Sequence, residues 1–557
     1  MKKNEIYEIE ITALSATGSG VGHIDGTAVF VPFSAVGDRL FVLIVKVKKN
    51  YAFGKITEII SPSPDRVKNA CPVFGRCGGC SFRHISYSAE VSAKALTVRD
   101  NIRRIGGIAD FETDPPICGK NRADRYRNKA QYPVRLENGE LKTGFFSQRS
   151  HRVNNCADCL LQPKIFEDII KTAAEFIKAF KITVYDENLK KGLVRHICVR
   201  LAEKTDEIMV IAVVNGSALP HSEVLVEALK NTVGERLKSV VLNINREDTN
   251  VVLGKECKTL FGSGFITDEI CGVRVRISPR SFYQVNREMA EKLYLKAAEY
   301  AKPDGKTVLD LYCGTGTIGL TMAKKAKKII GVEIVPEAVA DAEINAAENG
   351  TQNAEFICAD AAKAAAKLSK RGEKPDTVIL DPPRKGCSEE LLKITANEFS
   401  PERIVYVSCD SATLARDLKI LSELGYSLKK ATPCDLFPRT AHVETVVLLS
   451  HKKPDGHINV KVEFGEGEGK VPLDNIAKRA ESYKPKERVT YKMIKEYIEA
   501  KYGFKVHTAY IAEVKRDLGL PMYDAPNAVE ELKQPRKHPT PEKVEAIKDA
   551  LKHFEVI

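Results

Sequence analysis

The chain has 557 residues and carries 86 Lys and Arg against 74 Asp and Glu, a formal net charge of +12. Its 43% of hydrophobic residues can form packed cores and excludes disorder as the main state. The sequence shows no signal-peptide pattern, and no apolar run is long enough to span a bilayer. We therefore expect a cytoplasmic protein of roughly three or four domains, with no membrane contact, no obligate protein partner and no disulfide framework among its 14 cysteines.

Residues 1–62 predict a small, OB-like β-barrel. Short β-runs, such as 39–47 and 53–60, alternate with turn residues that include Gly37 and Asp38. Several short strands at this spacing indicate a barrel. Barrels of this size bind oligonucleotides in some proteins and are purely structural in others, and this segment alone favours neither function.

From residue 279 onward, apolar strands alternate with helices. The predicted strands are 308–311, 329–332, 354–357, 377–380, 404–407 and 445–449. This alternation predicts an α/β, Rossmann-like domain with a parallel sheet and helices on both faces. The predicted domains are therefore the barrel at 1–62, a central domain at 63–278, the α/β domain at 279–452, a polar linker at 453–484 and a helical extension at 485–557.

The carboxyl-terminal extension contains three helical patterns. Apolar residues recur on one face of each, as at Ile494 and Ile498. Residues 451–557 carry 21 basic and 18 acidic side chains, so they lack the charge of a nucleic-acid-binding helix-turn-helix. We favour a small helical appendage, and its role stays open.

A glycine-rich turn, Gly314-Thr-Gly-Thr-Ile-Gly319, follows the first α/β strand, and Glu333 lies 19 residues beyond Gly314. Such a turn with an acidic residue at the end of the next strand fits a dinucleotide-binding fold. Asp310, however, would repel a pyrophosphate, whereas it could accept from the ammonium group of S-adenosylmethionine. The pattern therefore favours S-adenosylmethionine as the cofactor, with Glu333 accepting from its ribose hydroxyls.

Two more acidic residues follow strands of this domain. Asp360 comes after the third strand and Asp381 after the fourth, at the edge where open α/β sheets bind ligands. The sequence Asp381-Pro-Pro-Arg384 is similar to the loop of many amino-methyltransferases, in which a following aromatic residue stacks on the base. Arg384 replaces that aromatic residue, which weakens this alternative.

Cys409 lies directly after the fifth strand and before a predicted helix that begins at Ser411. Because a helix amino terminus stabilises a thiolate, we expect the pKa of Cys409 to lie below its ordinary value of about 8.5. A thiolate that adds to carbon 6 of a pyrimidine makes carbon 5 nucleophilic, and a base must afterwards remove the carbon-5 proton. Glu444, or His442 in its place, is the predicted base.

Motifs along most of the chain resemble those of the RNA uracil-5 methyltransferases, which form 5-methyluridine. The resemblance covers about residues 5 to 450. Within the family, the chain is most similar to the iron–sulfur, TRAM-containing branch that acts on 23S rRNA. The motifs, in chain order, are Cys71 with Cys77-Gly-Gly-Cys80, Tyr126-Arg-Asn-Lys129, Ser278-Pro-Arg-Ser-Phe-Tyr-Gln-Val-Asn286, Asp310-Leu-Tyr-Cys-Gly-Thr-Gly316, Asp381-Pro-Pro-Arg384, Ser408-Cys409 and His442-Val-Glu444.

The resemblance implies a function for each part. It implies that residues 1–62 are a TRAM barrel that binds RNA, that Cys409 is the nucleophile and that Glu444 is the base. The expected substrate is 23S rRNA, and the alternatives are a tRNA or a non-enzymatic iron–sulfur RNA-binding assembly factor. The resemblance also implies a set of residues that hold or border the methyl donor: Gln284, Tyr312, Glu333, Asp360 and Asp381.

Five cysteines indicate a metal site. The spacing of Cys77 and Cys80, and of Cys156 and Cys159, by itself slightly favours zinc. The family pattern instead implies a [4Fe–4S] cluster held by Cys71, Cys77, Cys80 and Cys159, with Cys156 not a ligand. We adopt the cluster and keep zinc as the alternative.

The segment from Cys118 to Arg152 has nine basic residues against three acidic ones. Four aromatic residues interleave with these charges and are predicted to offer stacking surfaces to unpaired nucleobases. A solvated basic face is the plain alternative, but with pyrimidine chemistry nearby we adopt RNA contact. The aromatic residues are Tyr126, Tyr132, Phe145 and Phe146.

Overall fold

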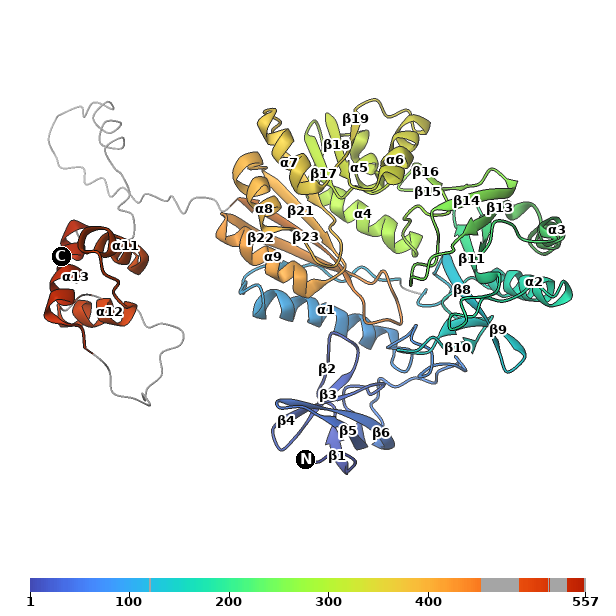
Figure 1. Ribbon diagram of the computed structural model, residues 1–557, viewed down its shortest axis with the longest axis horizontal. Coiled ribbons are helices and arrows are strands. Elements are labelled where there is room, and N and C mark those ends of the chain that lie inside the picture. Colours follow the sequence, from blue (N-terminus) through green and yellow to red (C-terminus); the bar gives the residue numbers. More distant parts are fainter. Residues whose placement is uncertain (120–121, 452–489, 519, 521–537, 555–557) are drawn as a thin grey trace, which may run out of the picture. The chain divides into compact units, whose positions relative to one another are not determined.

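The computed structural model describes residues 1–119, 122–451, 490–518, 520 and 538–554 (Figure 1). The chain divides into two compact units, Met1–Gly456 and His457–Ile557. Within the described ranges, we find no helix that combines the length and the hydropathy needed to cross a membrane. The predicted linker at 453–484 lies outside the described residues.

The first unit begins with a six-stranded sheet, which confirms the predicted barrel. Its strand order is β1-β5-β6-β4-β3-β2. Leu40, Val42 and Ile44 alternate with exposed residues along β5 and pack into the barrel core. The strands pack closely at Gly54, where a Cβ atom would lie 2.1 Å from Val42 Cγ1. The strands are β1 (Ile6–Glu10), β2 (Ala13–Leu14), β3 (Gly20–Ile24), β4 (Thr27–Val31), β5 (Arg39–Val47) and β6 (Tyr51–Ser61).

The central part of the unit is a seven-stranded sheet in the order β10-β9-β8-β11-β12-β13-β14. Strand β11 is buried along its whole length because both faces of the sheet are covered. Val199 faces a core shared with helices α2 and α3, whereas Cys198 faces a core shared with the α/β domain. The elements are β8 (Lys129–Glu137), β9 (Glu140–Phe146), β10 (Val153–Asn155), α2 (Ile165–Ala179), β11 (Val194–Ala202), β12 (Glu207–Val214), α3 (Ser222–Val233), β13 (Leu237–Ile244) and β14 (Glu256–Gly262).

The α/β domain has an eight-stranded sheet in the order β19-β18-β17-β20-β21-β23-β22-β7. All six strands that the sequence predicts are present. The sheet is not wholly parallel, however, because β23 runs antiparallel to both neighbours. A short loop joins β22 to β23, and such a loop can connect only antiparallel strands, whereas parallel strands need a crossover. The strands are β7 (Glu112–Thr113), β17 (Thr307–Leu311), β18 (Lys328–Glu333), β19 (Ala354–Cys358), β20 (Thr377–Leu380), β21 (Arg403–Ser408), β22 (Tyr426–Cys434) and β23 (Glu444–His451).

Helices cover both faces of this sheet, and two separate apolar cores result. Helix α4 contributes Leu293 and Ala297 to one core, and α1 contributes Val98 and Ile102 to the other. A two-stranded hairpin, β15 (Ile266–Ile270) with β16 (Val273–Ile277), precedes α4. The helices are α1 (Tyr87–Arg104), α4 (Arg287–Ala301), α5 (Thr317–Ala323), α6 (Pro336–Glu348), α7 (Ala361–Lys370), α8 (Glu389–Lys393) and α9 (Ser411–Glu423).

The second unit contains the three predicted helices, α11 (Tyr491–Tyr502), α12 (Thr508–Asp517) and α13 (Pro541–His553). The Thr490 side chain accepts from the N–H of Met493 at the start of α11, and Gly503 ends that helix in the left-handed conformation. The apolar faces of all three helices meet in one core, which includes Ile498 and Ile547.

Candidate active site

The glycine-rich turn connects β17 to α5 and is bound to the end of β18. The N–H of Gly314 donates to Glu333 Oε2 at 3.1 Å, and Glu333 Oε1 accepts from the N–H groups of Ile334 and Val335 at 2.8 and 2.9 Å. Gly316 has φ +77°, and a Cβ atom there would lie 2.9 Å from the Phe356 ring. Glycine is therefore required at this position, and the turn holds the Glu333 carboxylate in one orientation.

Asp310 is fully buried beneath this turn. Its Oδ2 accepts from the N–H of Gly319 at 2.9 Å, whereas its Oδ1 is buried without a hydrogen-bond partner. Burial, and after it the charge of Asp381, raises the pKa of Asp310 to about 8. An orphaned carboxylate oxygen of this kind suits a cationic donor such as an ammonium group.

Tyr312 and Asp360, two other expected donor residues, lie just beyond the carboxyl ends of β17 and β19. Asp360 is exposed and caps α7, accepting from the N–H groups of Ala362 and Lys363 at 3.1 and 3.2 Å. Tyr312 is partly buried and has φ +67°. Gln284 precedes α4, and its side chain hydrogen-bonds to Tyr294, a buried residue whose pKa is raised mainly by burial.

Cys409 lies between β21 and α9, as predicted. Asp410 caps α9 by accepting from the N–H groups of Ala412 and Thr413. The pKa expected for Cys409 was wrong in direction, however, because burial and then the charge of Glu444 raise the pKa of the thiol to about 11. The local effect of the helix terminus is smaller than the combined effect of burial and the neighbouring carboxylates.

Glu444 is the first residue of β23 and is buried. Ser408, at the end of β21, pairs with Thr445 in the antiparallel ladder. Cys409, which follows Ser408, and Glu444, which precedes Thr445, are therefore the next two positions beyond the last pair of this ladder. Burial, and after it the charge of Asp381, raises the pKa of Glu444 to about 8. His442, the alternative base, is more exposed than Glu444, and partial desolvation of its ring, followed by the charge of Arg384, lowers its pKa.

Asp381 follows β20, which lies between β17, the strand that contains Asp310, and β21, the strand that precedes Cys409. Burial raises the pKa of Asp381 to about 7. The charge of Arg384, three residues later, acts in the opposite direction on Cys409 and Glu444 and lowers the pKa of each. One sheet edge thus combines a thiol, three carboxyl groups of raised pKa and one exposed guanidinium group.

Asp417 is a site residue that the sequence analysis missed. It is fully buried on α9, and its Oδ2 accepts from the Tyr406 hydroxyl at 2.6 Å and from the Cys387 N–H at 2.9 Å. Arg416 donates to the Lys385 carbonyl at 2.9 Å. Helix α9 therefore holds the loop that carries Arg384. An acid amid the apolar positions of a helix is the signal that could have revealed this role.

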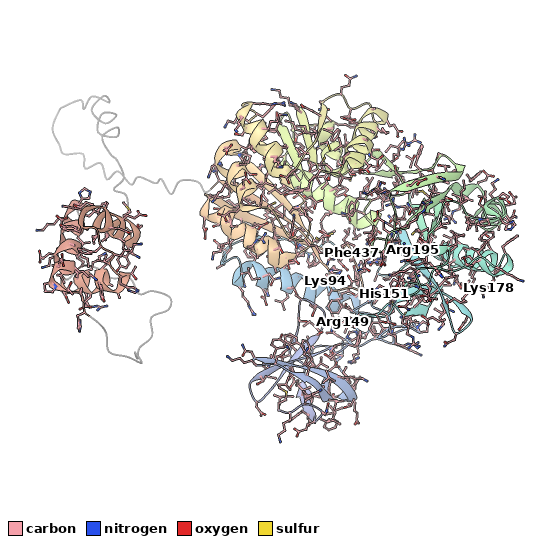
Figure 2. The ribbon with its side chains drawn as sticks, in the orientation of Figure 1. Lys94, Arg149, His151, Lys178, Arg195 and Phe437 are labelled. Carbon is pink, nitrogen blue, oxygen red and sulfur yellow. The ribbon has the colours of Figure 1, made fainter. Side chains whose placement is uncertain are left out.

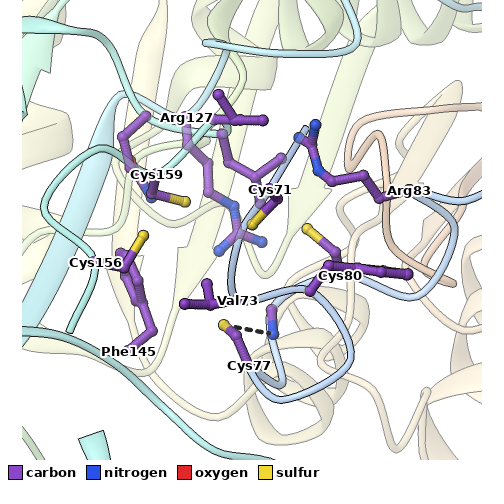
Figure 3. Close-up of a pocket in the computed structure, with 14 residues that line it drawn as sticks. Cys71, Val73, Cys77, Cys80, Arg83, Arg127, Phe145, Cys156 and Cys159 are labelled. Carbon is purple, nitrogen blue, oxygen red and sulfur yellow. Dashed lines mark hydrogen bonds between the residues drawn. The ribbon is translucent and has the colours of Figure 1, made fainter. Parts of the chain in front are cut away.

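The four predicted metal ligands, together with Cys156, line one cavity of about 50 Å³ (Figure 3). They come from two segments, one with Cys71, Cys77 and Cys80 and one with Cys156 and Cys159. Cys77 Sγ accepts from the N–H of Gly79 at 3.4 Å. In the described part of the chain, no three His, Cys, Asp or Glu side chains are disposed to hold a single metal ion.

The basic segment is less exposed than its composition suggests. Tyr126 and Tyr132 are fully buried, so the prediction that they stack on nucleobases is wrong. The Tyr126 hydroxyl donates to the Pro438 carbonyl at 2.9 Å, and Tyr132 packs against Phe145. Both tyrosines lie on or next to β8, whose sheet is covered on both faces, and this burial takes their rings out of solvent.

Several of the predicted cations in this segment are also engaged within the protein. Arg125 pairs with Asp158 at 2.5 Å, and Arg135 pairs with Glu187. Lys120 lies outside the described residues. Arg149 and Arg152 are exposed, so they are the cations of this segment best placed to meet a polyanion.

The amino-terminal barrel exposes a cluster of three aromatic rings, which we call the ring cluster: Phe30, Tyr51 and Phe53. Their centroids are 5.6 to 5.9 Å apart. Tyr51 is 38% and Phe53 37% exposed. Lys46 pairs with Phe53 across the β5–β6 ladder and is exposed. Aromatic rings beside a lysine form a surface on which bases can stack next to their phosphates.

Comparisons with known proteins show which proteins the chain is similar to. The family model described as tRNA (uracil-5-)-methyltransferase matches residues 99–452, and that of the TRAM domain matches residues 2–57. Uncharacterized RNA methyltransferases of Halalkalibacterium halodurans and Clostridium tetani are each 44% identical to the chain, over 81% of its length and 98% and 97% of their own. The Pyrococcus abyssi tRNA (uracil-54, C5)-methyltransferase, solved with S-adenosyl-L-homocysteine, is 29% identical with a TM-score of 0.64, covering 79% of this chain and 99% of that one.

Proposed function

Because the chain belongs to the S-adenosylmethionine-dependent RNA uracil-5 methyltransferase family, we propose that it methylates carbon 5 of a uridine in 23S rRNA. The choice of 23S rRNA rests on the cysteine motif that the chain shares with the iron–sulfur branch. A tRNA uridine is the second candidate, because the archaeal relative of known structure is named a tRNA methyltransferase. Either RNA agrees with the cytoplasmic localisation expected from the sequence.

The observation that supports this chemistry best is that Cys409 and Glu444 flank the paired residues Ser408 and Thr445 at the end of the β21–β23 ladder, where the charge of Glu444 acts on the thiol. Uracil methylation at carbon 5 needs a nucleophile and a base that reach the same ring. A thiol and a carboxyl group at the end of one strand ladder support this requirement. Amino-group methylation needs no thiol, so the pair favours a pyrimidine carbon over an exocyclic amine.

In the proposed mechanism, the Cys409 thiolate adds to carbon 6 of the uracil ring, and the ring electrons then make carbon 5 nucleophilic. The bound S-adenosylmethionine supplies an electrophilic methyl group, which carbon 5 takes up. The Glu444 carboxylate removes the proton from carbon 5, and the electron pair of that C–H bond expels Cys409 from carbon 6. The target base leaves its stack to reach the site.

The residues present fit the methyl donor. The unpartnered Oδ1 of Asp310 is available to its ammonium group. The Glu333 carboxylate, fixed by three backbone N–H groups, keeps lone pairs for the ribose hydroxyls. We propose that Gln284, Tyr312, Asp360 and Asp381 complete the edge of this site.

We further propose that Cys71, Cys77, Cys80 and Cys159 hold a [4Fe–4S] cluster, with zinc as the alternative. Burial raises the pKa of the Cys77 and Cys159 thiols, whereas the backbone N–H of Gly79 at Cys77 and of Leu161 at Cys159 acts in the opposite direction. Cys156 instead donates its S–H to the Asp158 carbonyl, which requires a protonated thiol. This contrast supports Cys159 over Cys156 as the fourth ligand, and the group would join the two cysteine segments.

The decisive experiment compares the intact protein with Cys409→Ala on 23S rRNA and tRNA that lack 5-methyluridine. We expect 5-methyluridine in 23S rRNA with the intact protein and none with Cys409→Ala, while Cys257→Ala, at an exposed thiol, behaves as the intact protein. Methylation that survives in Cys409→Ala would overturn the mechanism. Product only in tRNA would select the second candidate. RNA binding without any product would favour a non-enzymatic role.

A further inference from the structure

The loop of residues 435–443, which we call the base loop, leads directly into Glu444 and is held by distant parts of the chain. Lys94 Nζ donates to the Phe437 carbonyl at 3.1 Å, and Figure 2 labels both residues. From the central domain, the Tyr126 hydroxyl donates to the Pro438 carbonyl at 2.9 Å. The position of the base therefore depends on contacts made outside the α/β sheet.

Arg439 is the most constrained residue of the base loop. Its φ is +69°, in the left-handed region that residues other than glycine rarely adopt. Its N–H donates to Glu90 Oε1 at 2.6 Å, and its carbonyl accepts from the N–H groups of Ser81 and Phe82 at 2.8 and 3.1 Å. Contacts on both peptide groups hold the unfavourable conformation in place.

These contacts connect the base loop to a proposed cluster ligand. Ser81 and Phe82 follow Cys80 directly in the chain. A second connection passes through side chains. The Arg83 guanidinium hydrogen-bonds to the Cys80 thiol and pairs with Asp124 at 2.5 Å. The Arg439 guanidinium lies 3.8 Å from the same carboxylate. A shift of the Cys80 segment would therefore move Arg439 both through the main-chain hydrogen bonds of Ser81 and Phe82 and through the side chain of Asp124.

A buried charge cluster fixes the other side of the base loop. Glu90, Lys94 and Asp435 are 0%, 3% and 2% exposed. Lys94 Nζ lies 2.7 Å from Glu90 Oε1 and 2.6 Å from Asp435 Oδ1. Because separating buried partners leaves an uncompensated charge, this cluster makes α1 a rigid support for the loop.

We propose that Arg439 is a positioning residue whose left-handed main chain couples the Cys80 segment to the base Glu444. The inference rests on the proposed function and adds to it a link between the cysteine cavity and one chemical step. A disturbance at either side of Arg439 moves the base relative to carbon 5. It slows proton removal and leaves donor binding and the addition of Cys409 in place.

The test uses two substitutions that both remove the guanidinium group. Asparagine adopts a positive φ readily, whereas valine does not. With RNA tritiated at carbon 5 of uridine, we expect Arg439→Val to release tritium slower by about tenfold or more. Its covalent complex with RNA, resistant to denaturation, should accumulate. Arg439→Asn should stay within a few-fold of the intact protein, and calorimetric donor affinity should be unchanged in both.

A second measurement covers the case in which Arg439→Val does not fold. In Cys80→Ser, we expect amide hydrogen exchange in residues 435–443 to become faster, while exchange in β17 and β20 stays unchanged. Equal tritium release by Arg439→Val, Arg439→Asn and the intact protein would overturn the coupling. So would unchanged exchange of the base loop in Cys80→Ser. If the intact protein releases no tritium, the proposed function itself is wrong.

Discussion

Cys409 directly follows Ser408, the last residue of β21, and Glu444 directly precedes Thr445, the β23 partner of Ser408, and the charge of Glu444 opposes ionisation of the Cys409 thiol. Burial first, and Glu444 next, raises the pKa of Cys409 to about 11. Burial and Asp381 raise the pKa of Glu444 to about 8. The free protein at neutral pH therefore holds a protonated thiol next to a largely protonated acid. A cationic group bound at this edge would favour both anions.

Glu444→Gln should change the pH dependence of stability. The folded pKa of Glu444, about 8, lies above its ordinary value of 4.5. The folded state therefore binds the extra proton, and this stabilisation is complete below pH 4.5 and is lost as pH rises through 8. Relative to the intact protein, the variant should gain up to about 1.4 kcal/mol of unfolding free energy per pH unit across this window. Denaturant unfolding at pH 5, 6, 7 and 8 measures the difference, and a constant difference would contradict the assignment.

The reactivity of Cys409 should respond in opposite directions to two neighbouring charges. Removing the carboxylate in Glu444→Gln lowers the pKa of the thiol, so alkylation by iodoacetamide at pH 8 should become several-fold faster. Arg384→Ala removes a cation that lowers the pKa of the Cys409 thiol, so alkylation should become slower in this variant. Mass spectrometry of the peptide that contains Cys409 measures both, with exposed Cys257 as the internal control. Changes of equal sign would contradict the electrostatic picture.

Iron content should show which of Cys156 and Cys159 is a cluster ligand. Cys159→Ser removes a proposed ligand, so anaerobically purified protein should lose most of its iron and its visible absorbance. Cys156→Ser, the matched control three residues earlier in the chain, should keep both, because Cys156 donates its S–H to the Asp158 carbonyl. Elemental analysis for iron and zinc decides the case, and zinc in place of iron would select the alternative metal.

The ring cluster of the barrel should contribute to RNA affinity. Tyr51→Ala with Phe53→Ala removes two exposed stacking surfaces, each worth about 1–3 kcal/mol per base, so binding should weaken by tenfold or more. Ile6→Ala, which removes an exposed apolar side chain from β1, is the control. Fluorescence anisotropy with single-stranded RNA from the target measures both. Equal affinity of the two variants would exclude this face as a contact.

Sequence patterns were sufficient for the local elements of the α/β domain. The runs that contain Asp310, Glu333 and Asp381 are strands or strand ends because apolar stretches of this length between turn residues leave little choice. The adjacency of Cys409 and Glu444 could not be predicted in the same way. It depends on β23 entering the sheet between β21 and β22, a long-range pairing that no local pattern records.

Electrostatics and burial were also beyond local rules. The helix terminus beside Cys409 predicts a lowered pKa, but burial and two carboxylates from other strands outweigh it. Tyr126 stands among basic residues and looks exposed in the sequence, yet it lies in the interior and hydrogen-bonds to the base loop. The positive φ of Arg439 likewise follows from Ser81 and Glu90, which are hundreds of residues away.

The three carboxyl-terminal helices have a consequence for how such proteins diversify. Among the described residues, every side chain of their core comes from the extension itself, as Ile498 and Ile547 illustrate. The relatives are matched over 97% and 98% of their own lengths by only 81% of this chain. A segment whose core residues all come from itself does not draw on the rest of the chain to pack that core. Such an appendage can be gained or lost in evolution with its own core intact.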